Sequence, residues 1–501
     1  MTPQGLPPSS SDAGYFARLT LCLGAILLLR LGGLYFNNTD LVLDEAQYWT
    51  WSRELAFGYF SKPPMIAWVI RAASAICGDG EMCLRSASPV LYTAAAFVIY
   101  FTARALYDAR TGFWSAVVLA TLPGVSYSSN LITTDVPLVL FWSIALYAWV
   151  MLVKRQSMGC AILLGVAIGL GLFAKQAMLY AFLCIAVHAA VSGEARQALK
   201  GGRGVVVALV ALAVFSPNVW WNAEHGFPTV RHTEANIGWK PPYLHPKELI
   251  EYFGTQFAVF GPILFVVLLR ASWREIRRPH DPAKILLLSF SLPILALLAV
   301  QATLSRAHGN WTATAYPSAT ILVTAAMFEL NRLLLFRISL GLHVAAAVFL
   351  AFAPAFARQW PIFEQTKPFA RVVGWHETAE AVRAQLAEKG YAAILVDTRE
   401  MAGELLYYLR GVPLPLYVWP VGPVPMDHYE MTRPFTSGAP EPILYVSLKT
   451  CPTAFGKLFG NFQPLGSKQI KLVKTESRTV YFCRLADYKG PTAPNARMFA
   501  E

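Results

Sequence analysis

Long apolar segments separated by short polar connectors dominate the first 356 residues of the chain. A helix that spans a membrane needs about 20 mostly apolar residues. We therefore predict an all-α polytopic membrane domain over residues 1–356. No small-x-small cleavage site follows the first segment, so we expect it to remain as an uncleaved span. The eleven candidate spans are 15–36, 87–107, 111–129, 135–153, 159–175, 177–191, 204–218, 251–269, 284–304, 313–330 and 338–356.

The Lys and Arg residues between these segments predict their orientation. Cytoplasmic loops of membrane proteins carry an excess of these residues. A cytoplasmic N-terminus places the short basic connectors inside and the long segments 37–86, 219–250 and 357–501 outside. Eleven spans then place the C-terminus on the outer side of the membrane.

After residue 356 the pattern changes to alternating helix and strand signals. Helical spacing covers residues 375–389 and 400–409, and short β-prone runs cover 392–396, 442–448 and 480–485. Alternation of this kind is typical of an α/β domain. We predict a small α/β domain on the outer side of the membrane over residues 357–501.

Composition excludes a soluble or disordered chain. Of the 501 residues, 55% are hydrophobic and 14% are charged, whereas soluble domains carry about 25% charged residues. The net charge of +12 is consistent with loop cations and contacts to anionic membrane lipids. Because the basic residues are scattered and no nucleic-acid motif occurs, we expect no nucleic-acid partner.

Two cysteine pairs fall in segments predicted to lie outside. Cys77 and Cys83 flank a short loop, and Cys451 and Cys483 both belong to the C-terminal domain. An oxidising compartment permits disulfides. The sequence leaves open whether either pair is joined.

The first outer loop holds the most informative polar residues. Asp44 and Glu45 precede an aromatic stretch with Trp49 and Trp51, which are natural interfacial anchors. Asp44 is placed to cap the following helix, with Glu45 in its first turn. Two adjacent carboxylates at a membrane boundary are costly unless paired, so they are candidates for chemistry. Lys62 stands before two prolines and a predicted helix start, where a lysine suits a phosphate.

Other connectors on the same side are also rich in polar residues. Taken singly, each of these residues is explained by a capping or anchoring role. Their concentration on one face, opposite short basic connectors, indicates an outward-facing active site at the membrane surface. They include Asp135, Lys175, Asn218, Asn222, Arg231, Arg306, His308 and Asn310.

A metal site is left open by the sequence. His225 and His232 are seven residues apart, which is one face if the segment is helical, and Glu45 and Asp135 offer carboxylate oxygens. Tight zinc spacing does not occur. We expect no certain cofactor, with a divalent cation as the open alternative.

At these residues the sequence resembles a known family. The motifs LDEAxYW at 43–49, GYFxKPP at 58–64, TTD at 133–135, PNxxWNxxHG at 217–226 and HxNW at 308–311 resemble those of bacterial GT-C glycosyltransferases. The resembling branch contains protein O-mannosyltransferases, lipid A aminoarabinose transferases and galacturonic acid transferases of the lipopolysaccharide core. The resemblance covers about residues 15–356 of this chain.

The resemblance implies an inverting transferase with a polyprenyl-phosphate sugar donor and a periplasmic active site. Asp44 matches the catalytic carboxylate, Lys62 matches the lysine that contacts the lipid phosphate, and Glu45 and Asp135 match accessory acidic positions. Arg231 and His308 are further candidates for substrate binding. The aromatic residues after Asp44 and Glu45 depart from the aminoarabinose enzymes.

The resulting expectation is transfer of a sugar, with galacturonic acid favoured, to lipopolysaccharide core or lipid A. The open alternatives are a protein O-mannosyltransferase-like enzyme, a lipid A aminoarabinose transferase and, in another class, a polytopic lipid transporter. A transporter would show internal repeats and mid-span ionisable residues. The sequence shows no internal repeat, and its acidic residues lie at the ends of the predicted spans.

Overall fold

A computed structural model describes residues 10–241, 243–279, 281–360, 368–388, 390–422, 424–474 and 476–491. Its contacts divide the chain into two compact units. The membrane unit contains Met1–Phe36 and Lys62–Phe352, and the C-terminal unit contains Asn37–Ser61 and Ala353–Glu501. The predicted division at residue 356 therefore differs by two segments, Asn37–Ser61 and residues 353–356, which group with the C-terminal unit.

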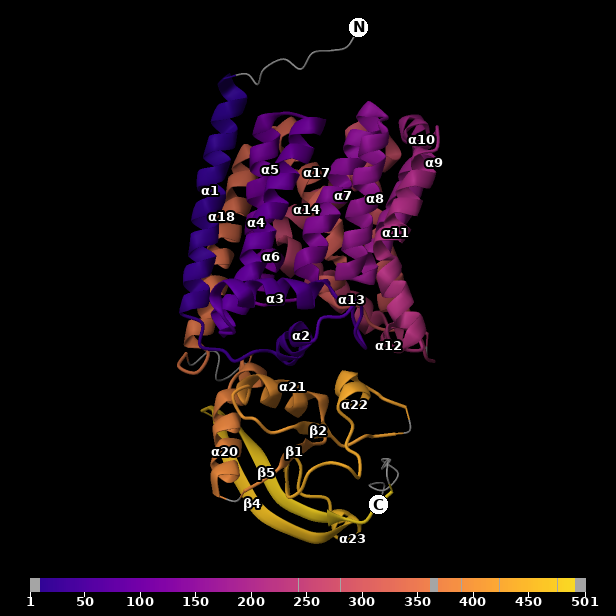
Figure 1. The fold of residues 1–501 in the computed structure, drawn as a ribbon. Coiled ribbons are helices and arrows are strands. Elements are labelled where there is room, and N and C mark those ends of the chain that lie inside the picture. Colours follow the sequence, from indigo (N-terminus) through magenta and orange to yellow (C-terminus); the bar gives the residue numbers. More distant parts are fainter. Residues whose placement is uncertain are drawn as a thin grey trace. The chain divides into compact units, whose positions relative to one another are not determined.

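The membrane unit is a bundle of helices, in which the long helices run side by side and α3 lies across them (Figure 1). Apolar side chains on several helices, including Leu23, Tyr100, Trp149 and Leu164, form its core. Its helices are α1 (Ser10–Tyr35), α3 (Met65–Cys77), α4 (Glu81–Leu106), α5 (Ala109–Thr121), α6 (Pro123–Ser128), α7 (Asp135–Arg155), α8 (Met158–Ala174), α9 (Tyr180–Val191), α10 (Gly193–Leu199), α11 (Arg203–Glu224), α12 (Pro228–Ile237), α13 (Pro246–Phe260), α14 (Pro262–Arg277), α15 (Pro282–Ser289), α16 (Leu292–Leu304), α17 (Tyr316–Glu329) and α18 (Leu333–Phe352). Short 3-10 turns η1 (Gln176–Leu179), η2 (Gly309–Ala315) and η3 (Ala353–Phe356) connect or extend helices, η3 lying in the C-terminal unit.

In the described residues, six helical segments are long and apolar enough to cross a membrane. The predicted span 251–269 is broken in the structure, because α13 and α14 meet at an angle of 110°. Gly261 lies at this turn with a φ of 90°, a backbone conformation that residues other than glycine rarely adopt. An added Cβ would also lie 2.2 Å from Nε2 of His343. The adjoining Pro262 then begins α14, a position that suits its fixed φ.

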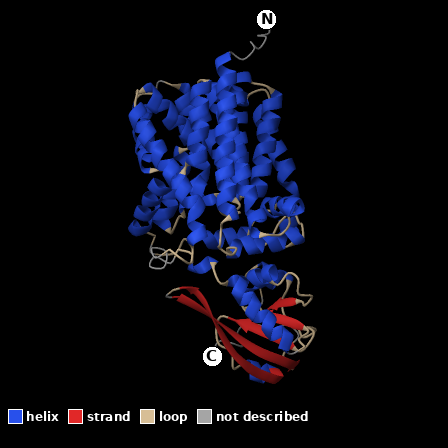
Figure 2. Ribbon diagram, turned by 90° about the vertical axis from the view of Figure 1, so that its left-hand side faces the viewer, coloured by secondary structure: helices blue, strands red, loops and turns tan. Residues whose placement is uncertain are grey.

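The C-terminal unit is a five-stranded sheet with helices, shown in red and blue in Figure 2. The strand order is β2-β1-β3-β5-β4, with β1 parallel to β2 and β3, and β5 antiparallel to β3 and β4. Its elements are α2 (Leu43–Arg53), η4 (Ala370–Val372), α20 (Trp375–Glu388), β1 (Ala393–Val396), α21 (Arg399–Tyr408), β2 (Leu416–Val418), α22 (His428–Thr432), β3 (Ile443–Ser447), α23 (Phe455–Leu458), β4 (Phe459–Val473) and β5 (Glu476–Tyr488).

The predicted helices and strands of this unit are present within a few residues of their expected bounds. Lys389, at the predicted end of the first helix, lies outside the described residues. The long edge strand β4 was not predicted. Both cysteine pairs are joined as disulfides, with Cα separations of 5.8 Å for Cys77–Cys83 and 6.4 Å for Cys451–Cys483, distances that a disulfide can bridge.

Segment Asn37–Ser61 is bound into this unit by specific contacts. The Asp40 carboxylate accepts a hydrogen bond of 2.6 Å from the backbone N–H of Trp375, at the start of α20. The backbone N–H of Leu41 donates to the hydroxyl of Tyr408 at 2.9 Å. Trp51, expected to be an interfacial anchor, is instead fully buried and stacked on Tyr59. The aromatic residues of this loop therefore build a protein core.

Candidate functional site

The acidic pair begins α2, but the two carboxylates have different environments. The helix begins at Leu43, so the predicted capping role of Asp44 is wrong. Glu45 supplies the cap instead, because its Oε2 accepts a hydrogen bond of 2.9 Å from the backbone N–H of Val42. Glu45 is buried, whereas half of the Asp44 side chain is exposed. Asp44 is thus the carboxylate of this pair that a substrate can reach.

Asp44 is paired with an arginine that sequence reasoning did not identify. The guanidinium of Arg399, the first residue of α21, donates to Oδ1 of Asp44. The helices α2 and α21 lie against each other, which brings these residues together across 355 positions of sequence. A charge-assisted hydrogen bond of this kind fixes the direction of a carboxylate. Arg399 therefore holds Asp44 in one orientation.

Another acidic residue near Asp44 in this unit is Glu404, which lies on α21 and is completely buried. Neither of its carboxylate oxygens has a hydrogen-bond partner among the described residues. Burial, together with the nearby charges of Asp40 and Glu45, raises the pKa of Glu404 well above the ordinary value. A buried carboxyl without a partner is neutral rather than charged. The raised pKa favours the protonated form of Glu404, which lies on the helix that packs against α2.

In the membrane unit, Asp135 joins two other polar residues from distant segments. Its Oδ1 lies 2.7 Å from Nζ of Lys175, and its Oδ2 accepts a hydrogen bond of 2.8 Å from Nδ2 of Asn310. Asp135 begins α7, Lys175 follows the end of α8, and Asn310 lies in η2. Asp135 is thus more than the simple helix cap that its position suggests, because both oxygens bind other segments.

These residues adjoin a pocket of about 440 Å³ within the membrane unit. Asp135, His308 and Asn310 supply polar groups to its lining, and the other lining residues are mainly apolar, including Leu122, Val139 and Val259. Partial burial and the neighbouring charge of Arg306 lower the pKa of His308. The imidazole is therefore mostly neutral near pH 7 and able to both donate and accept hydrogen bonds.

The remaining predicted residues lie apart from this pocket. Lys62 is half-buried, three residues before α3 begins at Met65, as the two intervening prolines predict. Arg231 lies on α12, where its guanidinium donates to the carbonyl oxygen of Gly226. Neither residue lines the pocket that contains Asp135 and His308.

The predicted metal ligands do not form a metal site in the structure. His225 follows the end of α11 and His232 belongs to α12, so the two histidines do not share one helical face. Gly226 and Phe227 separate the helices with positive φ values. In the described residues, no group of three His, Cys, Asp or Glu side chains is arranged to hold an ion. The Asp135 oxygens already bind Lys175 and Asn310, and a lysine would repel a cation.

Comparison with known proteins relates these motifs to membrane transferases. Residues 61–221 match the family model described as dolichyl-phosphate-mannose-protein mannosyltransferase. The chain is 34% identical over 450 residues to the lipid A galacturonosyltransferase RgtD of Rhizobium johnstonii, covering 89% of this chain and 94% of that one. It is 30% identical over 208 residues to the lipopolysaccharide core galacturonosyltransferase RgtA of the same organism, covering 40% and 41% of the two chains.

Solved structures resemble the whole fold. ArnT from Cupriavidus metallidurans bound to undecaprenyl phosphate superimposes with a TM-score of 0.63 at 17% identity, covering 95% of this chain and 99% of that one. Its apo form gives a TM-score of 0.65 at 18% identity, covering 96% and 100%. The chain therefore shares the GT-C fold of a helical membrane unit followed by a small C-terminal sheet, and it is a multi-pass membrane protein.

Proposed function

Because the chain belongs to the GT-C family of membrane glycosyltransferases that contains the lipid A galacturonosyltransferase of Rhizobium johnstonii, we propose that it transfers galacturonic acid from a polyprenyl-phosphate donor to lipid A. The observation that carries this proposal is an identity of 34% that extends over 94% of that relative. The relatives named for the lipopolysaccharide core match less than half of the chain. This difference favours lipid A over the core as the acceptor.

The proposed reaction is an inverting displacement at the anomeric carbon of the donor sugar. An acceptor hydroxyl oxygen forms a bond to this carbon while the bond from the carbon to the phosphate oxygen breaks. The phosphate departs on its polyprenyl carrier, and the hydroxyl proton passes to a base. We assign Asp44 as this base, because its carboxylate is half exposed and is held by Arg399. Positioned general bases contribute about 100-fold to 10,000-fold to a rate.

The departing phosphate gains negative charge, which nearby cations stabilise. We assign this role to Lys62, which precedes α3 and matches the lysine of the GYFxKPP motif. The mainly apolar pocket of the membrane unit is suited to an isoprenoid segment of the donor. Lys175 neutralises Asp135 beside this pocket, so an anionic donor meets no net negative charge there. Glu45 then acts by holding α2 rather than by contacting substrate.

We further propose that the enzyme lies in the bacterial inner membrane with eleven spans, a cytoplasmic N-terminus and a periplasmic C-terminal unit. The concentration of Lys and Arg in the short connectors supports this orientation. Under the same proposal, the acidic and aromatic loop with Asp44 faces the periplasm. Labelling of single cysteines introduced into the connectors of the intact membrane protein tests the orientation.

The decisive experiment supplies the purified full-length protein with labelled polyprenyl-phosphate galacturonic acid and lipid A. We expect labelled lipid A and free polyprenyl phosphate. The Asp44→Asn variant should lose at least about 100-fold in turnover, with donor binding intact. Glu388→Gln alters an exposed carboxylate of the same unit and is the matched control. Near-normal turnover in Asp44→Asn would contradict the assignment of Asp44 as the general base.

The donor is tested separately. The Lys62→Ala variant should raise the KM for the donor while the KM for lipid A stays unchanged, because only the donor carries the leaving phosphate. Offering the aminoarabinose donor in a parallel reaction tests the choice of sugar. Faster transfer of aminoarabinose than of galacturonic acid would contradict the proposed substrate.

A further inference from the structure

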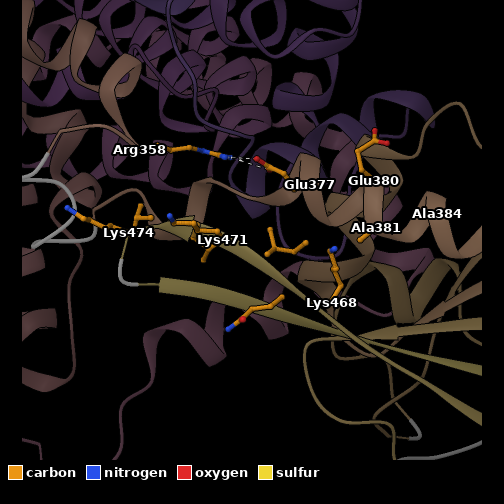
Figure 3. A pocket seen from close by; sticks show the side chains of 12 residues that line it. Arg358, Glu377, Glu380, Ala381, Ala384, Lys468, Lys471 and Lys474 are labelled. Carbon is orange, nitrogen blue, oxygen red and sulfur yellow. Dashed lines mark hydrogen bonds and ion pairs between the residues drawn. The ribbon is translucent and has the colours of Figure 1, made fainter.

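A basic groove of about 910 Å³ lies in the C-terminal unit, between α20 and the edge strand β4. Lys468 and Lys471 lie on β4, and Lys474 follows directly after it. Figure 3 shows these three lysines on one wall and the α20 residues Glu377, Glu380, Ala381 and Ala384 on the other. The two alanines add little bulk to their wall, which leaves space between the helix and the strand.

The acids beside this groove are already paired. Glu377 accepts hydrogen bonds from both terminal nitrogens of Arg358, one of them at 3.2 Å. Glu380 pairs with Arg383, three residues further along α20. In the part of the chain that the structure describes, Lys468 and Lys471 form no ion pair. The groove therefore has a surplus of positive charge, which favours an anionic ligand.

The spacing of the cations indicates the size of that ligand. Residues in a strand advance about 3.3 Å each, so the three steps from Lys468 to Lys471, both on β4, span about 10 Å. This separation is longer than one phosphate group. It suits an extended ligand with anionic groups at intervals, such as a phosphorylated chain of sugars.

Lysines on an edge strand also have a simpler role, because they discourage pairing with the edge of another sheet. That role explains the charge of β4. It does not require a groove with small residues on the facing helix, or acids that are neutralised by other arginines. The two explanations are separable, because glutamate in place of lysine still places a charge on the edge but reverses its sign.

We propose that this groove binds the acidic saccharide of the acceptor glycolipid through its phosphate or carboxylate groups. The proposal rests on the proposed function, in which the acceptor is lipid A or its core-bearing form. Binding here holds the acceptor saccharide on the C-terminal unit and lowers the KM for the acceptor. It takes no part in bond breaking, so turnover at saturating acceptor is unaffected.

The test uses the full-length protein in detergent and a deacylated, phosphorylated lipopolysaccharide saccharide as the probe. We expect the combined change Lys468→Glu and Lys471→Glu to raise the Kd for this saccharide at least about tenfold at low salt, because two attractive cations are replaced by two anions that repel the ligand. The difference should shrink at about 1 M salt, where charges are strongly screened. In the transfer reaction, the KM for the acceptor should rise while kcat and the KM for the donor stay unchanged.

The matched control is Lys449→Glu with Lys457→Glu. These lysines are exposed residues of the same unit, lie outside the groove and change the net charge equally. An equal loss of binding in both double variants would overturn the proposal, since net charge would then explain the effect. An unchanged Kd in the groove variant would also overturn it, and this outcome leaves the proposed transferase function standing if transfer is normal.

Two further measurements keep the test decisive. If the double variant does not fold, Lys471→Gln removes one charge with little change in size, and its Kd is expected to rise about threefold to fivefold. Vesicles containing phosphatidylglycerol separate a saccharide from a lipid surface. Loss of vesicle binding with saccharide binding intact would overturn the proposal. If no galacturonic acid transfer occurs with any variant, the binding measurement still tests the groove by itself.

Discussion

The ion pair between Asp135 and Lys175 gives a quantitative test of the membrane unit. The side chains are only 9% and 15% exposed, and Nζ lies 2.7 Å from Oδ1. Lys175→Met keeps the length of the side chain but leaves a buried carboxylate without its cation. Removing one partner of a buried pair costs about 3–5 kcal/mol. Because Asn310 still donates a hydrogen bond to Asp135 at 2.8 Å, we expect Lys175→Met to lower the free energy of unfolding by about 3 kcal/mol, near the lower limit of this range.

The combined change Asp135→Asn and Lys175→Met tests the cause. It removes the uncompensated charge, so we expect most of the lost unfolding free energy to return. The measurement is a denaturant titration of the full-length protein in mixed detergent micelles, with all three variants compared. Lys247→Met is the matched control, because Lys247 pairs with Glu251 at 3.6 Å but both side chains are largely exposed. Such surface pairs contribute about 0–1 kcal/mol.

Two results would refute this reasoning. One is a loss below about 1 kcal/mol in Lys175→Met, as expected of a surface pair. The other is a double variant no more stable than the single variant. Activity then separates structure from chemistry: if Asp135 only holds Lys175 and Asn310 in place, the stable double variant should keep most of its turnover. A stable but inactive double variant would instead indicate that Asp135 contacts the donor.

Three further predictions concern the C-terminal unit. The buried Glu404 has a raised pKa, so the folded protein keeps a proton that the unfolded chain loses above its ordinary pKa of 4.5; stability should therefore fall as pH rises from about 4.5 toward the folded-state value. Glu404→Gln should abolish this loss of stability, measured by thermal unfolding between pH 4 and 8. The same pH profile in the variant and the parent protein would contradict the role of Glu404. Gly374 has a φ of 87° and a close neighbour on β4. Gly374→Ala should therefore lower the free energy of unfolding by about 2 kcal/mol, measured by thermal unfolding. Gly390→Ala is the control, because an added Cβ there meets open space and should change the stability little. Arg399→Met should lower kcat about tenfold because Asp44 loses its positioning partner, with partial rescue by Arg399→Lys and no change in the KM for the donor; a kcat equal to that of the parent enzyme would exclude this role.

The membrane unit shows which features local sequence can predict. Spans are visible because lipid contact requires a continuous apolar stretch, and the six described helical segments that are long and apolar enough to cross a membrane overlap predicted spans. The Gly261–Pro262 pair signals a break, but the angle of 110° between α13 and α14 depends on the packing of His343 against the turn. Strand β4 was not predicted, because its local sequence carries no clear strand signal. It contains Pro464 and Gly466, pairs only with β5 and has no regular alternation of apolar residues.

The site shows the same limit more sharply. Sequence motifs were sufficient to select Asp44, Lys62 and Asp135 as polar residues in an apolar chain, since such residues are costly at a membrane boundary without a purpose. They also indicated the class of enzyme. What each carboxylate does locally depended on partners that are remote in sequence. Arg399 lies 355 residues from Asp44, and Asn310 lies 175 residues from Asp135.

Patterns of apolar and charged residues act over a few neighbours, so they determined the helices, the two-part organisation and the candidate residues of this protein. Only the tertiary structure decided that segment Asn37–Ser61 belongs to the C-terminal unit, that Glu45 caps a helix while Asp44 remains accessible, and that Glu404 is buried. The physical reason is that burial, ion pairing and hydrogen bonding depend on distance in space. That distance is set by the packing of whole elements, which no local pattern contains.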